Sequence, residues 1–507
     1  MPQSINQRKA GAILNYVIIA LNALVGLLYT PFLIHSLGQS EYGLYSLVVP
    51  VVGYLTLLDF GFGNAVIRYT AKYRAEGKLR EQYEMWGMFL VLYCVIAVVA
   101  FLVGLGLYFN IENLFGATMT EYEIGRAKIL TIILVFNLCI NFPFAIFGAI
   151  LSAYEEFVFQ KVVNIARIIL NTVVMIILLT QGFKSVALVV VQTILNVATM
   201  LLNLWYCRHK IHIKIIVGSF NWSFLKEVAI YSFWIFLNAI MDKIYWSTGQ
   251  FVLGAVSGTI AVSVFAVGIH LQSMYMTFST AISSVFLPRV SMMVAQGDNK
   301  REISDLFIRT GRVQFLIMSL ILCGFIVFGR PFIRYWAGVE YGDSYIITVL
   351  FFASLFVPLI QNVGITILMA RNQMKFRSLL YIIIAAVSLV AQIVLSKAFG
   401  SVGCAVAIAV ALIVGQGFLM NIYYKKRQDI DIAGFWRQIL KMSIAPILLT
   451  VASYVLMSRI VIDSIASLLA AMFVFALAYC TVLWIFSMSS YERNLVLELI
   501  KKTLCRK

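Results

Sequence analysis

Charged residues are scarce in this sequence. Only 12% of its 507 residues are Asp, Glu, Lys or Arg, whereas 62% are hydrophobic, and the mean hydropathy is +0.93. The sequence also lacks any polar stretch as long as the ~50 residues that a small folded domain needs. These two shortages exclude a soluble globular enzyme and predict a protein that lies in a membrane along its whole length.

Cysteine and histidine are few and scattered. Five of the seven cysteines lie inside apolar runs, and neither they nor the four histidines have disulfide or metal-ligand spacing. We therefore expect no metal and no cofactor, and we interpret the cysteines as packing residues. A glycine-rich filter loop and a ring of acidic residues are also missing, which favours a transporter over a channel.

Apolar runs long enough to cross a bilayer, at ~20 residues each, follow one another along the chain. They lie at residues 11–34, 44–67, 85–109, 127–152, 162–181, 185–206, 227–253, 260–288, 313–333, 345–370, 378–396, 402–424, 438–458 and 464–487. No small-x-small cleavage site follows the first run, so we expect it to be retained as a span. The sequence predicts an all-α polytopic membrane protein with about 14 transmembrane helices.

The formal charge of +17 is distributed unevenly over the predicted loops. With the amino terminus inside, 31 of the 39 lysines and arginines, Lys161 and Arg167 among them, fall on one side of the membrane. Seven fall on the other side, and Lys243 lies within a span. This positive-inside pattern predicts that both termini are cytoplasmic. A large positive charge is also typical of nucleic-acid binding, but its distribution favours membrane orientation, and we expect no nucleic-acid partner.

The chain repeats itself at an offset of ~216 residues. Leu21-Asn22-Ala23 aligns with Leu237-Asn238-Ala239, and Pro143 aligns with Pro358. Six spans separate the copies, an even number, so the halves are parallel repeats, as in secondary transporters that bind substrate between two lobes near the midplane. The predicted organisation is an N-lobe of helices 1–6 (residues 1–210), a C-lobe of helices 7–12 (211–427), helices 13 and 14 (428–490) and a cytoplasmic amphipathic tail (491–507).

Three ionisable residues lie deep in predicted spans. Because placing a charged side chain inside the membrane costs free energy, a functional role is the first hypothesis for each. They are Asp59 in the second span and Asp242 and Lys243 in the seventh; Asn238 shares a helix face with Asp242. Counted from the cytoplasmic span ends, Lys243 is ~10 Å deeper than Asp59. Two alternatives remain: a structural salt bridge between Asp59 and Lys243, or a lysine that faces a water-filled cavity and binds an anion.

Polar residues beside two repeat-related prolines form a second group of candidates. Asn141, with Asn137, flanks Pro143, and Gln361, with Asn362, flanks Pro358. Proline frees backbone groups that need partners, so these side chains either hydrogen-bond between helices or face a cavity. His270 in the eighth span has the same two alternatives, packing or cavity lining.

Four motifs stand out along the chain. They are Gly38 followed by Glu41-Tyr42-Gly43-Leu44-Tyr45-Ser46, Asp242-Lys243 followed by Gly254, Phe286-Leu287-Pro288-Arg289 followed by Gly297-Asp298, and Ala370-Arg371-Asn372-Gln373-Met374-Lys375. These motifs resemble the Wzx-type polysaccharide flippases of the multidrug/oligosaccharidyl-lipid/polysaccharide exporter superfamily. The similarity covers essentially the whole chain.

The resemblance implies a bacterial inner-membrane protein, not an enzyme. Such a protein moves an undecaprenyl-diphosphate-linked oligosaccharide, such as an O-antigen unit, from the cytoplasmic to the periplasmic leaflet by alternating access. It also implies that Lys243 contacts the diphosphate or an acidic sugar, with Asp59 and Asp242 orienting it or coupling to protons. The implied partners are membrane lipids and the polymerase and glycosyltransferases of the pathway.

Other functions remain as alternatives. A cation-coupled multidrug exporter of the same superfamily is the nearer one. Its cavity would be acidic or aromatic to hold organic cations, and the two acids and one base inside the predicted spans do not decide between the two functions. A membrane glycan polymerase would carry a long periplasmic loop, whereas the longest outside segment here spans only residues 110–126. Relatives that flip the peptidoglycan precursor carry arginines in the first span, whereas residues 10–40 here contain no Lys or Arg. This difference disfavours the peptidoglycan precursor as the cargo.

Overall fold

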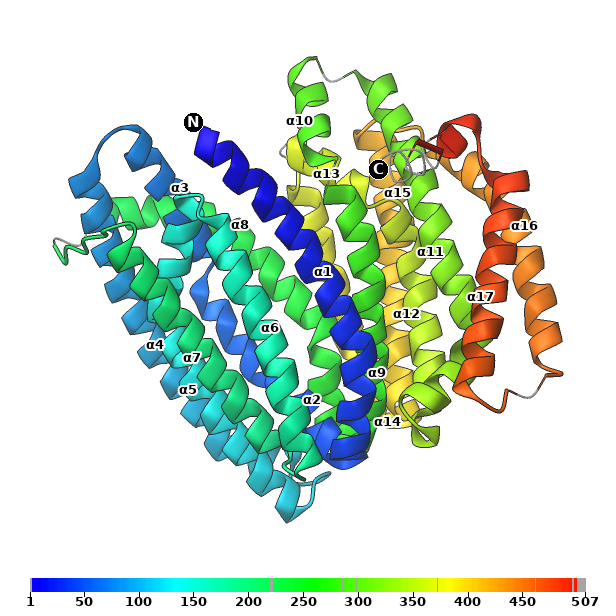
Figure 1. Cartoon of the computed structure of the whole chain (residues 1–507), viewed down its shortest axis with the longest axis horizontal. Coiled ribbons are helices and arrows are strands. Elements are labelled where there is room, and N and C mark those ends of the chain that lie inside the picture. The colour runs from blue at the N-terminus through cyan, green and yellow to red at the C-terminus, as the bar shows by residue number, and fades with distance from the viewer. Residues whose placement is uncertain are drawn as a thin grey trace. The chain divides into compact units, whose positions relative to one another are not determined.

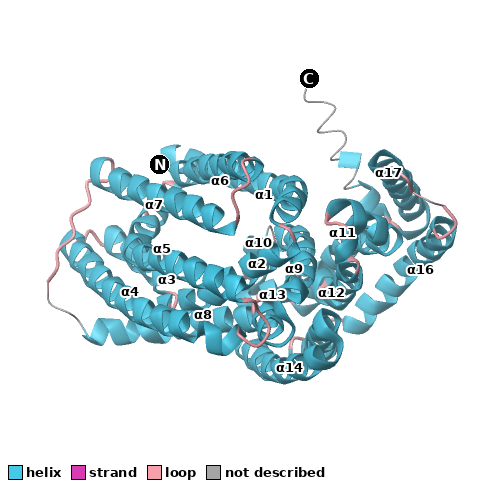
Figure 2. Ribbon diagram, turned by 90° about the horizontal axis from the view of Figure 1, so that it is seen from below, coloured by secondary structure: helices cyan, strands magenta, loops and turns pink. Residues whose placement is uncertain are grey.

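The computed structural model describes residues 2–218, 222–284, 286–297, 299–371, 373–460, 462–494 and 497–498. Throughout these residues the chain forms helices and loops and no strand (Figure 2). Twelve helical segments in the described part are long and apolar enough to cross a membrane. The protein is therefore an all-α, multi-pass membrane protein, which confirms the predicted fold class.

The described residues group into two compact units that meet in the chain at Ser263 and Val264 (Figure 1). The first unit contains α1 (Pro2–Leu37), α2 (Gln39–Gly53), η1 (Tyr54–Asp59), α3 (Phe62–Ala75), α4 (Leu79–Phe115), α5 (Glu121–Ala153), α6 (Phe157–Thr180), α7 (Ser185–His209), α8 (Trp222–Trp246) and the first part of α9 (Thr248–Ser284). The second contains the rest of α9, α10 (Leu287–Ala295), α11 (Lys300–Trp336), η2 (Val339–Tyr341), α12 (Asp343–Ile360), α13 (Val363–Ala370), α14 (Lys375–Leu412), η3 (Ile413–Leu419), α15 (Met420–Arg427), α16 (Ile432–Met457), α17 (Ile465–Val482) and η4 (Leu483–Ser487). The predicted lobes, residues 1–210 and 211–427, are derived from the sequence repeat rather than from compactness. The division into two units does not test them, so they stay a prediction.

Two of the twelve segments are long enough to cross the membrane twice. Lys375–Arg427 has 53 residues and contains Gly400, whose φ of 57° is left-handed. Cys404 Sγ lies 3.7 Å from Gln392 Oε1, although a straight helix would separate the two residues by ~18 Å. The chain therefore turns back at Gly400. Ala239–Ser283, with 45 residues, also contains a non-helical glycine. The total of fourteen spans stays a prediction.

In the first unit, α5 packs against α4 and α7, and α1 packs against α6 (Figure 1). Long helices satisfy their own backbone groups, which the interior of a bilayer requires. A capping box starts α5: the Thr120 hydroxyl accepts from the Glu123 amide, and Glu123 Oε2 accepts from the Thr120 amide. These contacts place the polar middle turns of α5, α6 and α7 next to one another.

Glu123 also joins α2 and α9 to α5. The hydroxyls of Ser40 and Thr259 each donate to Glu123 Oε1 at 2.6 Å, and the Glu123 side chain is almost fully buried. Close by, a Cβ on Gly43 would lie 2.0 Å from the Thr259 carbonyl oxygen, so only glycine fits where α2 meets α9. The first part of α9 is thereby held in the first unit.

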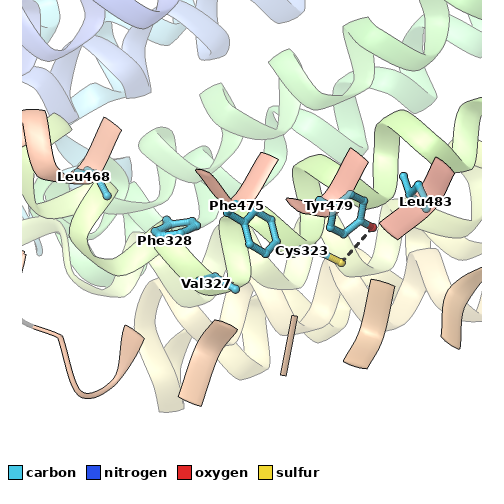
Figure 3. Close-up of a cluster of buried hydrophobic side chains, with 7 residues drawn as sticks. All are labelled: Cys323, Val327, Phe328, Leu468, Phe475, Tyr479 and Leu483. Atoms are coloured by element: carbon cyan, nitrogen blue, oxygen red, sulfur yellow. Dashed lines mark hydrogen bonds between the residues drawn. The ribbon is translucent and has the colours of Figure 1, made fainter. Parts of the chain in front are cut away.

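In the second unit, α17 packs against α11 through a buried apolar cluster. The cluster consists of Cys323, Val327, Phe328, Leu468, Phe475, Tyr479 and Leu483 (Figure 3). The Tyr479 hydroxyl donates to Cys323 Sγ at 3.7 Å. Because lipid is as apolar as these side chains, close packing rather than exclusion from water stabilises the contact. The C-terminal helices are thus an integral part of the second unit.

Candidate functional site

The register between α8 and the α2–α3 segment places Lys243 deep in the first unit. At one end, the Tyr69 hydroxyl of α3 donates to Glu227 Oε1 of α8, 2.8 Å away. Lys243 is 16 positions after Glu227, and Gly53 is 16 positions before Tyr69. Since the segments run antiparallel, the equal spacing brings Lys243 level with Gly53, ~24 Å from the Tyr69–Glu227 bond.

The Lys243 ammonium group lies against Gly53, where α2 ends. A Cβ placed on Gly53 would be 3.2 Å from Lys243 Nζ. The Tyr54 hydroxyl donates to the main-chain oxygen of Lys243 at 3.2 Å and lies 2.5 Å from Thr248 Oγ1, so it holds the end of α8. Nζ is half-buried and forms no hydrogen bond or ion pair with the described residues. A membrane-embedded cation without a fixed partner is a candidate for binding a mobile anion.

Asp59 accepts hydrogen bonds at the start of a helix rather than forming the predicted salt bridge with Lys243. Its carboxylate accepts a hydrogen bond from the Tyr93 hydroxyl at 2.8 Å and from the amides of Gly61 and Gly63. These glycine amides belong to the start of α3, so Asp59 caps the break between η1 and α3. Within the described residues it makes no ion pair with Lys243, because the two lie at different depths. The structure thus does not form the predicted Asp59–Lys243 salt bridge, and the anion-binding role of Lys243 stays a prediction.

Gly53 also lines a cavity of about 140 Å³ within the first unit. Its polar wall is formed by Asn137, Asn141 and Asn196, and Asn196 Nδ2 donates to Asn137 Oδ1 at 2.8 Å. Asn141, one of the predicted candidates, therefore lines the same cavity as the glycine that lies against Lys243.

A second cavity, of about 290 Å³, shares Asn137 and Asn196 with the first. Arg167 lines it, donating through Nη1 to Asn196 Oδ1 at 3.3 Å and through Nη2 to Asn164 Oδ1 at 3.1 Å. Sequence analysis counted Arg167 as cytoplasmic, but it lies ten residues, or ~15 Å, into α6. A signal was present: Asn164, Arg167 and Asn171 recur at helical spacing on one face of an apolar helix.

The remaining candidates do not gather at these cavities. Asp242 is exposed, and the side chain of Asn238 lies outside the described residues. In the second unit, buried Gln361 exchanges hydrogen bonds with Asn421 at 2.9 and 3.1 Å, and His270 stacks on Trp336 at 6.0 Å between ring centroids. Both arrangements fit the packing alternative for these residues.

Substituting Gly53 with alanine tests whether the position of the Lys243 ammonium matters. The Gly53 backbone is helical (φ −57°), so alanine is compatible with the fold, but its Cβ forces Nζ to move by a few tenths of an ångström. We expect a several-fold lower transport rate with an unchanged or slightly higher melting temperature. Gly106→Ala, where a Cβ meets nothing within 4 Å, is the matched control. Equal rates in both variants would contradict the proposed importance of this contact.

Comparison with known proteins agrees with this architecture. Residues 9–294 match the family model "Polysaccharide biosynthesis protein". The "Putative O-antigen transporter" of Shigella flexneri is 21% identical over 410 residues, which are 80% of this chain and 94% of the relative. The solved structure of the lipid II flippase MurJ in an inward closed conformation superposes with a TM-score of 0.71 at 15% identity, covering 96% of this chain and 99% of MurJ.

An inward-facing multidrug resistance MATE family transporter of the MOP superfamily is also similar. Its TM-score is 0.57 at 16% identity, and the match covers 82% of this chain and 99% of that one. At these identities the two structures show a shared fold and nothing more. The family model spans more than half of the chain, and so the chain belongs to the polysaccharide biosynthesis protein family, as its resemblance to the Wzx-type flippases predicted.

Proposed function

We propose that this protein moves an undecaprenyl-diphosphate-linked oligosaccharide repeat unit from the cytoplasmic to the periplasmic leaflet, for surface polysaccharide or O-antigen biosynthesis. The family match and the names of two relatives, an O-antigen transporter and a lipid II flippase, support a lipid-linked glycan as the cargo. In this role the protein is a transporter rather than an enzyme.

The observation that carries the proposal is the ammonium of Lys243, which has no hydrogen bond or ion pair among the described residues. It lies ~24 Å along the helix from the Tyr69–Glu227 level and beside Gly53, a residue that lines a cavity together with Asn137 and Asn141. The diphosphate is the part of the cargo that hydrocarbon excludes most strongly, because burying an uncompensated charge is costly. A lysine ammonium binds phosphate as a compact point charge, and the attraction is stronger where water is scarce.

The carboxylates near this lysine are proposed to orient the cargo or to couple its movement to protons. Asp242 is adjacent in α8, and Asp59 lies at the break that follows η1. Asn238 and Asn141 are proposed to add hydrogen bonds to the head group, whereas Gln361 and His270 are weaker candidates because each already has a protein partner.

The cycle we propose is alternating access by two parallel repeats, the usual arrangement in transporters built by duplication. The protein would lie in the bacterial inner membrane with both termini in the cytoplasm, as its distribution of basic residues favours. Its partners would be membrane lipids and the polymerase and glycosyltransferases that act on the same glycan.

A cation-coupled multidrug exporter is the second candidate, since a MATE transporter shares the fold. The charges in the first unit disfavour it. Arg167 lines a cavity and Lys243 lies beside Gly53; both are membrane-embedded cations, and they would repel the organic cations that such an exporter carries.

Deleting the gene tests the proposed function. We expect lipid-linked oligosaccharide to accumulate on the cytoplasmic leaflet and surface glycan to disappear, with drug sensitivity unchanged. Leaflet location can be measured by the accessibility of the glycan to lectin or periodate in oriented membrane vesicles. Increased drug sensitivity with normal surface glycan would support the exporter and refute the flippase.

A further inference from the structure

Arg167 lies in the middle of a membrane helix, and it makes no ion pair with an acidic residue in the described part of the chain. It is ten residues from the start of α6 and thirteen from its end, so both ends are ~15 to 20 Å away. The described residues that line its cavity are Asn22, Val25, Asn137, Arg167, Ile168, Asn171, Thr172, Gln192, Leu195 and Asn196, with no Asp or Glu. The positive charge is therefore uncompensated by protein in this part of the structure.

The hydrogen bonds that Arg167 makes leave most of its donors available. A guanidinium has five N–H groups, and here one bond goes to Asn196 and one to Asn164, both to neutral amide oxygens. An amide oxygen orients the guanidinium but cannot neutralise it. The arrangement therefore fixes the direction of the side chain and leaves its charge to a mobile partner.

A second observation points to an occupied cavity. Asn171 Oδ1 is buried in the same wall and accepts no hydrogen bond from the described residues. A buried acceptor of this kind is normally satisfied by a water or a ligand hydroxyl. The volume of about 290 Å³ has room for an ion and several waters, given the ~30 Å³ that one water occupies in the liquid.

The charge balance selects the class of ligand. A cation would be repelled by Arg167, and a neutral sugar would leave its charge unbalanced. A lipid-linked phosphate would bring its glycan and lipid with it, whereas this cavity of about 290 Å³ has room for only a small ion with its water. A small monovalent anion with its water balances the guanidinium, and the water can donate to Asn171 Oδ1.

We propose that the cavity around Arg167 is a binding site for a small monovalent anion of the chloride class. The side chains of Asn137, Asn196 and Asn171 line it, and Arg167 supplies the charge. The site goes beyond the proposed transport of a lipid-linked glycan, because it would hold its ion with or without cargo. It shares Asn137 and Asn196 with the cavity beside Gly53, so its occupancy also affects the wall of that cavity.

Melting of the purified protein tests the site without any transport measurement. The melting temperature is compared at constant ionic strength in gluconate, a large organic anion, and in chloride or bromide at ten times the dissociation constant. The halide should raise it by ~1 to 2 °C. Arg167→Gln should abolish the shift. Lys161→Gln removes a cation from the same helix outside the cavity and should retain the shift; Lys161 Nζ donates to Asn15 Oδ1 at 2.8 Å. No halide effect in the wild type, or an equal effect in Arg167→Gln, would overturn the proposal.

Direct localisation of bromide in the wild-type protein tests the site even if Arg167→Gln fails to fold. Crystals of the wild-type protein soaked in bromide should show anomalous density within hydrogen-bond distance of the Arg167 guanidinium. Density elsewhere only would refute the site. Because neither experiment measures glycan movement, a negative result here leaves the proposed function untouched, and failure of the deletion test leaves this site untouched.

Discussion

Replacing Lys243 with glutamine is expected to reduce glycan transport by roughly 10- to 150-fold, which corresponds to loss of a ~1.5 to 3 kcal/mol charged hydrogen bond. Glutamine keeps the length and polarity of the side chain but removes the positive charge that would meet the diphosphate. Since Nζ has no partner among the described residues, its removal breaks no structural contact. The variant should therefore reach the membrane and melt no lower than the wild type.

Two further variants make the Lys243 experiment specific. Lys243→Arg keeps the charge and should retain part of the activity, less than full because the planar guanidinium must fit beside Gly53. Lys226→Gln removes an exposed lysine near the N-terminal end of the same helix and should transport normally. The measurements are surface glycan and the leaflet distribution of the lipid-linked precursor. Normal transport by Lys243→Gln would refute the anion role.

The second large effect is expected at Glu492, which joins the segment after η4 to α11. Its carboxylate receives Nε and Nη2 of Arg312 at 2.6 and 3.0 Å, and the Glu492 side chain is only 2% exposed. Arg312 also donates to Gln438 and to the Ser487 carbonyl. Glu492→Ala leaves Arg312 buried without its counter-ion, which typically costs ~3 to 5 kcal/mol. We expect a clear drop in melting temperature for the purified protein.

Surface and isosteric variants separate this effect from a general loss of charge. Glu84→Gln removes the acid of the exposed Arg80–Glu84 pair and should change stability by less than ~1 kcal/mol. Glu492→Gln keeps the shape and should fall between Glu84→Gln and Glu492→Ala. If Glu492→Ala melted like Glu84→Gln, the buried pair would contribute nothing to stability.

The same pair predicts how stability depends on pH. Burial raises the pKa of Glu492, but the hydrogen bonds from Arg312 and Ser489 outweigh it and hold the pKa below its usual value. The folded protein then binds this proton more weakly than the unfolded chain, so the contribution is complete above the unfolded pKa of ~4.3 and is lost as pH falls. The difference in melting temperature between wild type and Glu492→Gln should shrink as pH is lowered through this range.

Of the two membrane-embedded cations, Lys243 was identified as a candidate from the sequence and Arg167 was not. Lys243 was identified because it is an isolated charge inside a long apolar run, a pattern visible in one segment. The distribution of basic residues groups Arg167 with the cytoplasmic side, although it lies five residues inside the predicted span start at 162 and ten residues after the start of α6 at Phe157. Span boundaries are read from gradual changes in hydropathy, and an error of one turn moves a residue by ~5 Å in depth.

The tertiary contacts of Asp59 and of the asparagines could not be predicted from the sequence, because they join residues that are far apart along the chain. Whether Asp59 pairs with Lys243 depends on the register of α8 against α2 and α3, which the Tyr69–Glu227 bond and the equal 16-residue spacing establish. Asn137 and Asn196, 59 positions apart, form the common wall of two cavities. Such a wall exists only after α5 and α7 have packed together.

By itself, the sequence determined the membrane class, the predicted orientation and the family resemblance, because hydropathy and the placement of basic residues act locally along the chain. Only the tertiary structure decided which polar groups share a cavity, which acid caps a helix and which two cations remain without a described counter-ion. The physical reason is that charge compensation depends on neighbours in space. The charge of a membrane-embedded lysine or arginine is compensated only if another helix brings an acidic side chain next to it.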